Sequence, residues 1–349
     1  MRILLRLGLV AVTAGVLTSC AADAPVAAAA VCRSEPGPES GLRVNAVSDA
    51  YFYADAPGGA QAGYALGGGV VPLEPGEYVA RLNNTRQPVT VEGGQVTTCE
   101  TATIDVAGTT SEYWYLLDTL SAQLGYSLLD GSLGVFPGRY TIRVNNTHQS
   151  VTADARNTVS LATGTIRVAG ATSEYFYVLD QNGQQLAYSL LGEPLSLLPG
   201  SYRARVNNTL APFTIEGGRA TTLTAGTVLA TGTTSEYYYV LDTAGEQLGY
   251  ALLGNASSYL PGTYTVRLNN RTTPIEVSGG DSTVVRTGTV VVEGKDREYY
   301  YVLDDAGTQL GYSLLGRPMS MLPGEYRVRV GERTDPVTVV ANEETARAP

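Results

Sequence analysis

The strongest constraint in this sequence is a period of 62 residues that begins near residue 41 and continues to the C-terminal region. Aromatic triplets recur with this step, and they start at Tyr51, Tyr113, Tyr175, Tyr237 and Tyr299. A proline recurs with the same step, at Pro75, Pro137, Pro199, Pro261 and Pro323. So regular a period indicates tandem copies of one structural unit. The sequence therefore predicts five repeats, at 41–102, 103–164, 165–226, 227–288 and 289–349.

The third repeat indicates the secondary structure of each copy. Residues 165–168 alternate between apolar and polar, residues 175–179 are aromatic and β-branched, and residues 202–206 alternate with arginines on one face. Turn residues separate these runs, and no window has a helical period. We predict an all-β chain in which every copy is a small antiparallel β-sandwich of six or seven strands.

Two turn signals support this interpretation. Leu198-Pro199-Gly200 suits a type II turn, in which proline fixes φ and glycine takes the positive φ. Asn207-Asn208 lies between two alternating runs and suits a two-residue hairpin, because asparagine tolerates the left-handed region.

Residues 198–206, a Pro-Gly turn followed by an alternating strand, and residues 215–223, a hairpin around two glycines, carry a family resemblance. They are similar to PEGA-type and carboxypeptidase-regulatory-like repeats. The resemblance implies prealbumin-like β-sandwiches, which occur in tandem on bacterial surface proteins. It implies an elongated array for the present chain.

The N-terminal residues have the pattern of an export signal. Arg2 and Arg6 precede an apolar stretch at residues 7–17. This stretch has 11 residues (17−7+1), which is too short to span a bilayer. The segment ends in Leu-Thr-Ser-Cys20, which resembles a bacterial lipobox. The resemblance implies a signal peptide at 1–19, a fatty acyl chain such as palmitate on Cys20, and sorting to the outer membrane in a Gram-negative host. The alternative is an ordinary signal peptide that is cut near Ala27–Ala30.

Residues 20–40 are rich in alanine, proline and glycine, and we expect a flexible tether there. The C-terminal residues from Glu343 onward are expected to fray. Apart from Cys20, the cysteines are Cys32 and Cys99. An exported protein meets oxidising conditions, so we expect these two to form a disulfide that ties the end of the tether to the first repeat. The alternative is two free thiols.

Composition argues against several functions. Lys+Arg total 23 and Asp+Glu total 33, a net charge of −10, which does not suit nucleic-acid binding. One histidine, His148, and three cysteines leave few residues for a metal site or a His-dependent hydrolase. Asp180, Asp242 and Asp304 each begin a turn that ends in glycine, which predicts a turn and not a calcium loop. We expect no catalytic residues, no metal and no cofactor.

The aromatic strand has two faces, because alternate residues of a strand share a side. Acidic residues, Glu174 and Asp180, flank one side, so we expect the other side, with Tyr175 and Tyr177, to face the core. The middle aromatics would then face outward; they are Phe52, Trp114, Phe176, Tyr238 and Tyr300. There they would pack against the neighbouring unit or form a platform for sugars or peptidoglycan.

These features favour a lipid-anchored protein of the cell envelope that acts as a structural stalk, spacer or interaction scaffold. A 62-residue globule has a diameter of about 27 Å, so five in a straight row would reach roughly 130 Å. The alternative is a surface lipoprotein that binds carbohydrate or peptidoglycan through exposed aromatic strands. A closed five-bladed propeller is a third possibility, although blades usually have four strands and a shorter period.

Overall fold

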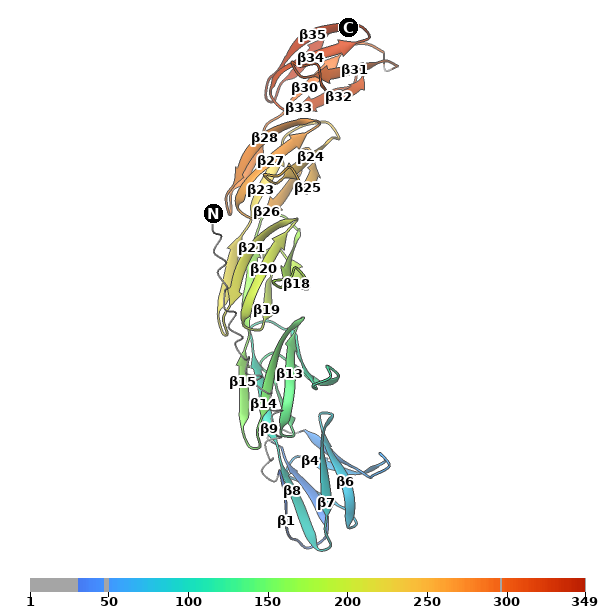
Figure 1. Cartoon of the computed structure of the whole chain (residues 1–349), viewed down its shortest axis with the longest axis vertical. Helices are drawn as coiled ribbons and strands as arrows, with labels where there is room; N and C mark the ends of the chain where they lie inside the picture. The colour runs from blue at the N-terminus through green and yellow to red at the C-terminus, as the bar shows by residue number, and fades with distance from the viewer. Residues whose placement is uncertain (1–30, 47–49, 296, 349) are drawn as a thin grey trace, which may run out of the picture.

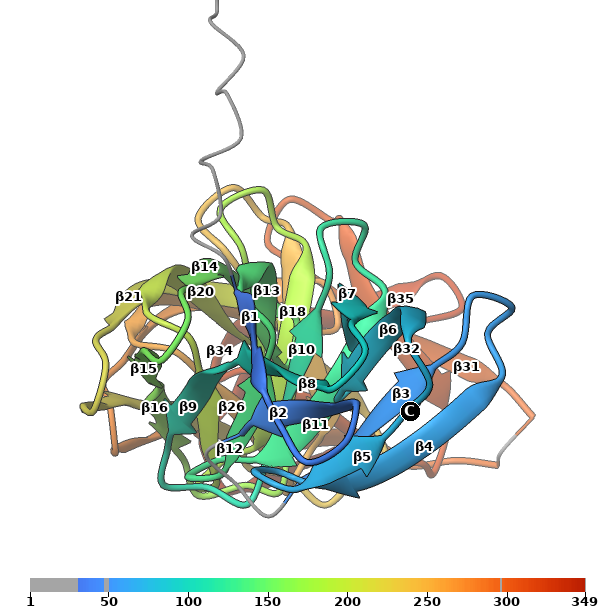
Figure 2. The same ribbon diagram turned by 90° about the horizontal axis from the view of Figure 1, so that it is seen from below.

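The chain forms a rod of five β-sandwich units stacked end to end (Figure 1). The computed structural model describes residues 31–46, 50–295 and 297–348, so the predicted signal peptide and Cys20 lie outside the described residues. Figure 2 looks along the rod from the end of the first unit, with the later units behind it. The predicted tandem all-β array is confirmed, and the chain is not a closed propeller.

The third unit represents the others. Its strands are β16 (Gly164–Ala169), β17 (Tyr175–Leu179), β18 (Gln185–Leu190), β19 (Pro194–Leu197), β20 (Gly200–Val206), β21 (Thr209–Ile215) and β22 (Ala220–Thr224). Three strands form one sheet in the order β19-β16-β22, and four form the other in the order β18-β17-β20-β21. All neighbouring pairs are antiparallel except β16 and β22, which are parallel. This parallel pair departs from the prediction, because the last strand crosses back to lie beside the first.

The other units repeat this arrangement. The first contains β2 (Gly41–Asn45), β3 (Tyr51–Asp55), β4 (Gln61–Leu66), β5 (Val70–Pro72), β6 (Gly76–Leu82), β7 (Thr85–Val91) and β8 (Gln95–Glu100). The second contains β9 (Ala102–Ala107), β10 (Tyr113–Leu117), β11 (Gln123–Leu128), β12 (Ser132–Val135), β13 (Gly138–Val144), β14 (Thr147–Ala153) and β15 (Thr158–Ala162). The fourth contains β23 (Gly226–Ala230), β24 (Tyr237–Leu241), β25 (Gln247–Leu252), β26 (Ala256–Tyr259), β27 (Gly262–Leu268), β28 (Arg271–Val277) and β29 (Ser282–Val285). The fifth contains β30 (Gly288–Val292), β31 (Tyr299–Leu303), β32 (Gln309–Leu314), β33 (Met319–Met321), β34 (Gly324–Val330), β35 (Arg333–Val339) and β36 (Glu344–Arg347).

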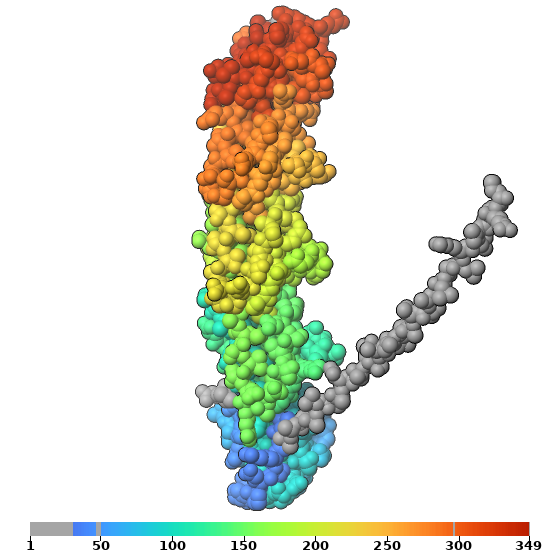
Figure 3. All heavy atoms as spheres, turned by 60° about the vertical axis from the view of Figure 1, so that its left-hand side comes forward, coloured from blue at the N-terminus to red at the C-terminus, as the bar shows by residue number. Residues whose placement is uncertain are grey.

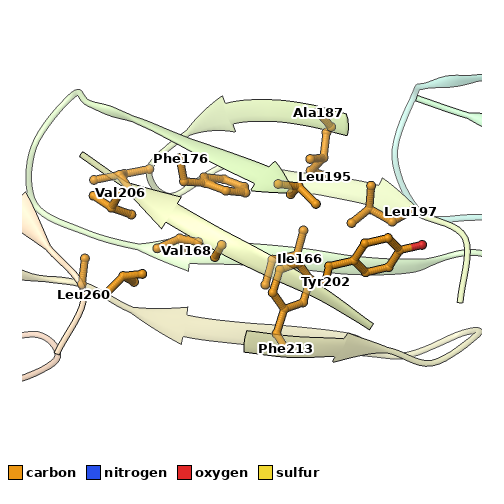
Figure 4. Packing of buried hydrophobic residues seen from close by; sticks show 14 of the residues in the cluster. Ile166, Val168, Phe176, Ala187, Leu195, Leu197, Tyr202, Val206, Phe213 and Leu260 are labelled. Atoms are coloured by element: carbon orange, nitrogen blue, oxygen red, sulfur yellow. The ribbon is translucent and has the colours of Figure 1, made fainter. Parts of the chain in front are cut away.

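The core of each unit lies between its two sheets, and the middle aromatic of the triplet is part of it. In the third unit Phe176 is fully buried and packs among Val168, Leu195 and Val206 (Figure 4). All five middle aromatics are 0% exposed; they are Phe52, Trp114, Phe176, Tyr238 and Tyr300. The prediction that these residues face outward is therefore wrong, and their burial excludes them as a ligand platform.

The flanking tyrosines take the opposite face. Tyr175 is 47% exposed and Tyr177 is partly exposed, so this side of β17 is not the core. The acids misled the prediction because both lie just outside the strand. Asp180 shapes the following turn by accepting hydrogen bonds from the backbone N–H groups of Asn182 and Gln184, as the turn interpretation predicted. A β-bulge between Val178 and Leu179 then lets two consecutive residues point inward.

Polar tips of the buried middle aromatics are satisfied by backbone carbonyls. Trp114 Nε1–H donates to the carbonyl of Gly131, and the Tyr238 hydroxyl donates to the carbonyl of Asn255, 3.0 Å away. The Tyr300 hydroxyl donates to the carbonyl of Arg317 at 2.9 Å. These three carbonyls occupy the same place in the repeat. One core position thus accepts Phe, Tyr or Trp, since a partner is available to each polar tip.

The turns match one prediction and correct another. Asn207 has a φ of 49°, so asparagine does take the left-handed region at the hairpin, as predicted. Gly200 is not among the positive-φ residues; it is the first residue of β20, so the type II turn with a left-handed glycine is wrong. Glycine is needed at position 200 for a different reason: a Cβ there would lie 2.9 Å from the Tyr202 hydroxyl oxygen.

Both ends of the described chain are more ordered than the sequence suggested. β1 (Cys32–Pro36) pairs antiparallel with β8 and adds a fourth strand to the first unit, so this part of the predicted tether is a strand. Cys32 and Cys99 face each other across this pair and form the expected disulfide. β36 pairs parallel with β30, so the expected fraying from Glu343 is not observed up to Arg347.

Buried tyrosines make stability sensitive to alkaline pH. Burial raises the pKa of Tyr140, Tyr259 and Tyr300 to about 12, above an unfolded value of roughly 10. Their contribution is therefore complete below pH 10 and is lost as pH rises toward 12, because the unfolded chain gives up these protons first. We expect tyrosinate absorbance to rise in two steps, the later one accompanied by loss of β-sheet circular dichroism. A single step near pH 10 with the sheet signal intact would contradict this.

Candidate functional site

The joints between units are built around one apolar side chain. Leu198 precedes the Pro-Gly pair of the third unit, is 1% exposed, and belongs to the hydrophobic core of the second unit. Leu260 of the fourth unit likewise lies beside Val206 of the third (Figure 4). We call the four residues at this position the plugs; they are Phe136, Leu198, Leu260 and Leu322. The first unit has the exposed Glu74 instead.

Backbone groups of the plug are satisfied on both sides of the joint. The N–H of Leu198 donates to Thr147 Oγ1 of the preceding unit at 3.1 Å, and Thr147 donates in turn to the carbonyl of Val144 at 2.7 Å. The hydroxyl of Tyr202 donates to the carbonyl of Leu198 at 2.8 Å. Both the N–H and the carbonyl of the buried plug therefore have hydrogen-bond partners. This avoids the free-energy cost of burying unpaired backbone groups.

A carboxylate reinforces the same joints. Glu174 of the third unit accepts hydrogen bonds from the Ser258 N–H at 2.6 Å and the Ser257 hydroxyl at 3.0 Å, both in the fourth unit. Glu112 and Glu236 accept the equivalent backbone hydrogen bond, from the N–H groups of Ser196 and Ser320.

The first joint uses other residues. Ala50 and Gly134 stand where the other joints have glutamate and serine. An ion pair between Arg156 and Glu100, 2.7 Å long, crosses this joint instead. The hydrogen bond from Arg156 is the main cause that lowers the pKa of Glu100 below its usual value.

The outward face of each four-stranded sheet carries a row of two tyrosines and an arginine. In the third unit Tyr188 on β18 pairs with Tyr177 on β17, and Tyr177 pairs with Arg205 on β20. The two rings are 6.2 Å apart, and Arg205 Cζ lies 4.7 Å from the centre of the Tyr177 ring. Tyr175 also contacts Tyr188, at 5.7 Å. We call the three tyrosines and the arginine of one unit a Tyr-Arg cluster.

The cluster recurs in all five units. The arginines are Arg81, Arg143, Arg205, Arg267 and Arg329, each over a tyrosine ring. The most exposed tyrosines are Tyr64, Tyr126, Tyr188, Tyr250 and Tyr312, which are 58–61% exposed. Arg81 also forms an ion pair with Asp55, whereas leucine stands at the Asp55 position in the other four units. These large rings are left in water at the same place in every unit.

A groove of about 900 Å³ lies where the clusters of the second and third units meet. Tyr113, Tyr115 and Arg143 line it from the second unit, and Tyr188 lines it from the third. Polar residues complete the lining, among them Asn146, Gln185 and Glu193. Figure 3 shows the outline of the rod indented between successive units.

The sequence could have placed the flanking tyrosines correctly. Arg203 and Arg205 share one face of an alternating strand, and arginine rarely enters a small core. Tyr177 is the cross-strand neighbour of Arg205, so pairing the two strands first would have put Tyr177 on the solvent side. His148 is exposed as expected, although it lies in β14 and not in a loop.

Within the part of the chain that the structure describes, no three His, Cys, Asp or Glu side chains gather in a way that would hold a metal ion. Over the same residues there is no helix of the length and apolar character needed to cross a bilayer.

Comparison with known proteins identifies no family. No family model and no curated protein matches the chain. Among solved structures, the TIE protein of Bacillus anthracis is 10% identical with a TM-score of 0.17, over 91% of this chain and 74% of that one. The major pilin subunit BcpA of Bacillus cereus is 10% identical with a TM-score of 0.15, over 54% and 98%. The pilus adhesin SpaC from Lactobacillus rhamnosus GG is 9% identical with a TM-score of 0.13, over 90% and 53%. The β-sandwich units that the sequence resemblance implied are present, but membership of the PEGA-type family has no support here.

The plugs predict a large local effect of a small substitution. Leu198→Ala is expected to destabilise the joint between the second and third units by about 2–5 kcal/mol, because it leaves a cavity in a core that the two units share. Hydrogen exchange should then accelerate in β9–β15 and β16–β22 while the fifth unit is unaffected. Leu210→Ala is the matched control, since Leu210 is 45% exposed, and it should cost less than roughly 0.5 kcal/mol. Equal protection in both variants would show that the plug does not join the units.

Proposed function

We propose that this protein is a non-catalytic spacer of the cell envelope, a rod of set length that separates its far end from a membrane. The observation that carries this proposal is the joint, in which a plug from one unit enters the core of the unit before it. Flexible linkers would let the units tumble independently, whereas a shared core couples the orientation of neighbours.

The connections between units support stiffness as well. Only one residue, Ala225, separates β22 from β23; it is 3% exposed, and its N–H donates to the carbonyl of Ala169. The equivalent residues at the other joints are similarly buried; they are Thr101, Thr163 and Thr287. A buried and hydrogen-bonded connection has little freedom to act as a hinge.

Location in the envelope rests on two supports. The disulfide between Cys32 and Cys99 suits an oxidising compartment outside the cytoplasm. The lipobox-like ending at Cys20 supports attachment to a membrane through an acyl chain, which would hold the first unit nearest the surface. Binding of envelope polysaccharide through the middle aromatics is not part of the proposal, because those side chains are fully buried.

Small-angle scattering tests the spacer. The exported chain is expected to have a maximum dimension on the order of 130 Å, as five stacked globules require. Replacement of Glu112, Glu174 and Glu236 by alanine together should bend or loosen the rod, because each carboxylate ties two units. Glu216→Ala is the control, since Glu216 is largely exposed and forms an ion pair with Arg219 of its own unit. Scattering typical of a compact globe from the unmodified chain would overturn the spacer.

Mass spectrometry tests the anchor. The exported chain is expected to begin at Cys20 with the added mass of fatty acyl groups and to sediment with membranes. Cys20→Ala should release a soluble product of the same fold, because the described units do not depend on the anchor. A mature chain that begins beyond residue 20 and carries no acyl mass would refute the anchor and leave the rod intact.

A further inference from the structure

We propose that the groove between the second and third units binds a polysaccharide chain, and that the Tyr-Arg clusters are its contact surface along the rod. This goes beyond the spacer, which needs only the joints. It also concerns a set of aromatic residues different from the buried middle positions.

The tyrosines present the kind of surface that sugar rings recognise. A pyranose has apolar C–H faces and a polar edge, so it stacks on an aromatic ring and hydrogen-bonds at its rim. Tyr113 and Tyr188 are 47% and 59% exposed, and both line the groove. Exposed tyrosine combines a rigid apolar face with a hydroxyl at little cost in conformational entropy.

Arg143 supplies the polar part of the site. The ring of Tyr115 holds its guanidinium, with Cζ 4.4 Å from the ring centre. Arg143 is only partly buried and lines the groove, so the accessible part of its guanidinium can donate hydrogen bonds to a ligand there. Asn146 and Gln185 lie on the same lining and add amide donors and acceptors. A few convergent polar groups beside aromatic faces are the usual composition of a site for a polar ligand.

The groove suits a polysaccharide better than a protein partner. Protein interfaces bury a core that is depleted in charge, whereas this groove contains Glu112, Arg143 and Glu193 among its lining residues. The tyrosines of the groove also recur at the next joint as Tyr175, Tyr177 and Tyr250. Repeated sites suit a ligand with a repeated chemical unit, because linked weak contacts add through effective concentration.

The test uses the whole exported chain and three probes: insoluble peptidoglycan sacculi by co-sedimentation, and dextran and polygalacturonate by affinity electrophoresis. We expect binding to at least one of them. A variant with serine at all five of the most exposed tyrosines should bind at least about tenfold more weakly, since every cluster loses its most accessible stacking ring. Those positions are Tyr64, Tyr126, Tyr188, Tyr250 and Tyr312.

Two controls keep the result interpretable. Leu120→Ser removes an even more accessible apolar residue, 87% exposed, from the hairpin tip of the second unit and should leave binding unchanged. Thermal unfolding and scattering of the five-serine variant should match those of the unmodified chain, so the spacer and the binding surface are judged separately. The proposal is overturned if the unmodified chain binds none of the three probes, or if the serine variant binds as well as the unmodified chain.

Discussion

The insertion of one apolar side chain into the neighbouring core is the interaction on which this rod depends. A unit of this size buries only a modest share of its surface, so its core alone gives little margin of stability. Leu198 and Leu260 extend those cores across the joints, and the Thr147 and Tyr202 hydroxyl groups satisfy the backbone around Leu198. Stability and shape therefore share one cause, because the contact that completes a core also sets the direction of the next unit.

The repeat, the fold class and the cysteine pair could be predicted from the sequence, because each follows from residue types and their spacing along the chain. The period of 62 residues marks the units, and the left-handed Asn207 marks a hairpin. Which face of the aromatic strand is buried depends on contacts with other strands and with the following unit, so the residues of the strand alone do not show it. An acid at Glu174 predicts a solvent face, but its carboxylate reaches into the following unit, and this contact exists only in the assembled joint.

The two faces of the four-stranded sheet carry different residues in every unit. The inner face contains the middle aromatic, such as Phe176, and the outer face contains the arginine and the flanking tyrosines. A prediction that is wrong by one residue exchanges all buried and exposed positions of the strand, since alternate residues point to opposite sides. For this reason the sequence predicts an exposed aromatic surface on the correct strand but places the middle aromatic, and not the flanking tyrosines, on that surface.

The equal spacing of the joints has a genetic consequence. Loss or gain of one full period in the middle of the chain would join β15 to β23 or duplicate a unit, and the new joint would again have a plug, a threonine and a glutamate. Recombination between neighbouring copies of the coding sequence would then shorten or lengthen the product in whole-unit steps without disturbing any core. Chains that differ in copy number would then carry the same Tyr-Arg clusters along rods of different length.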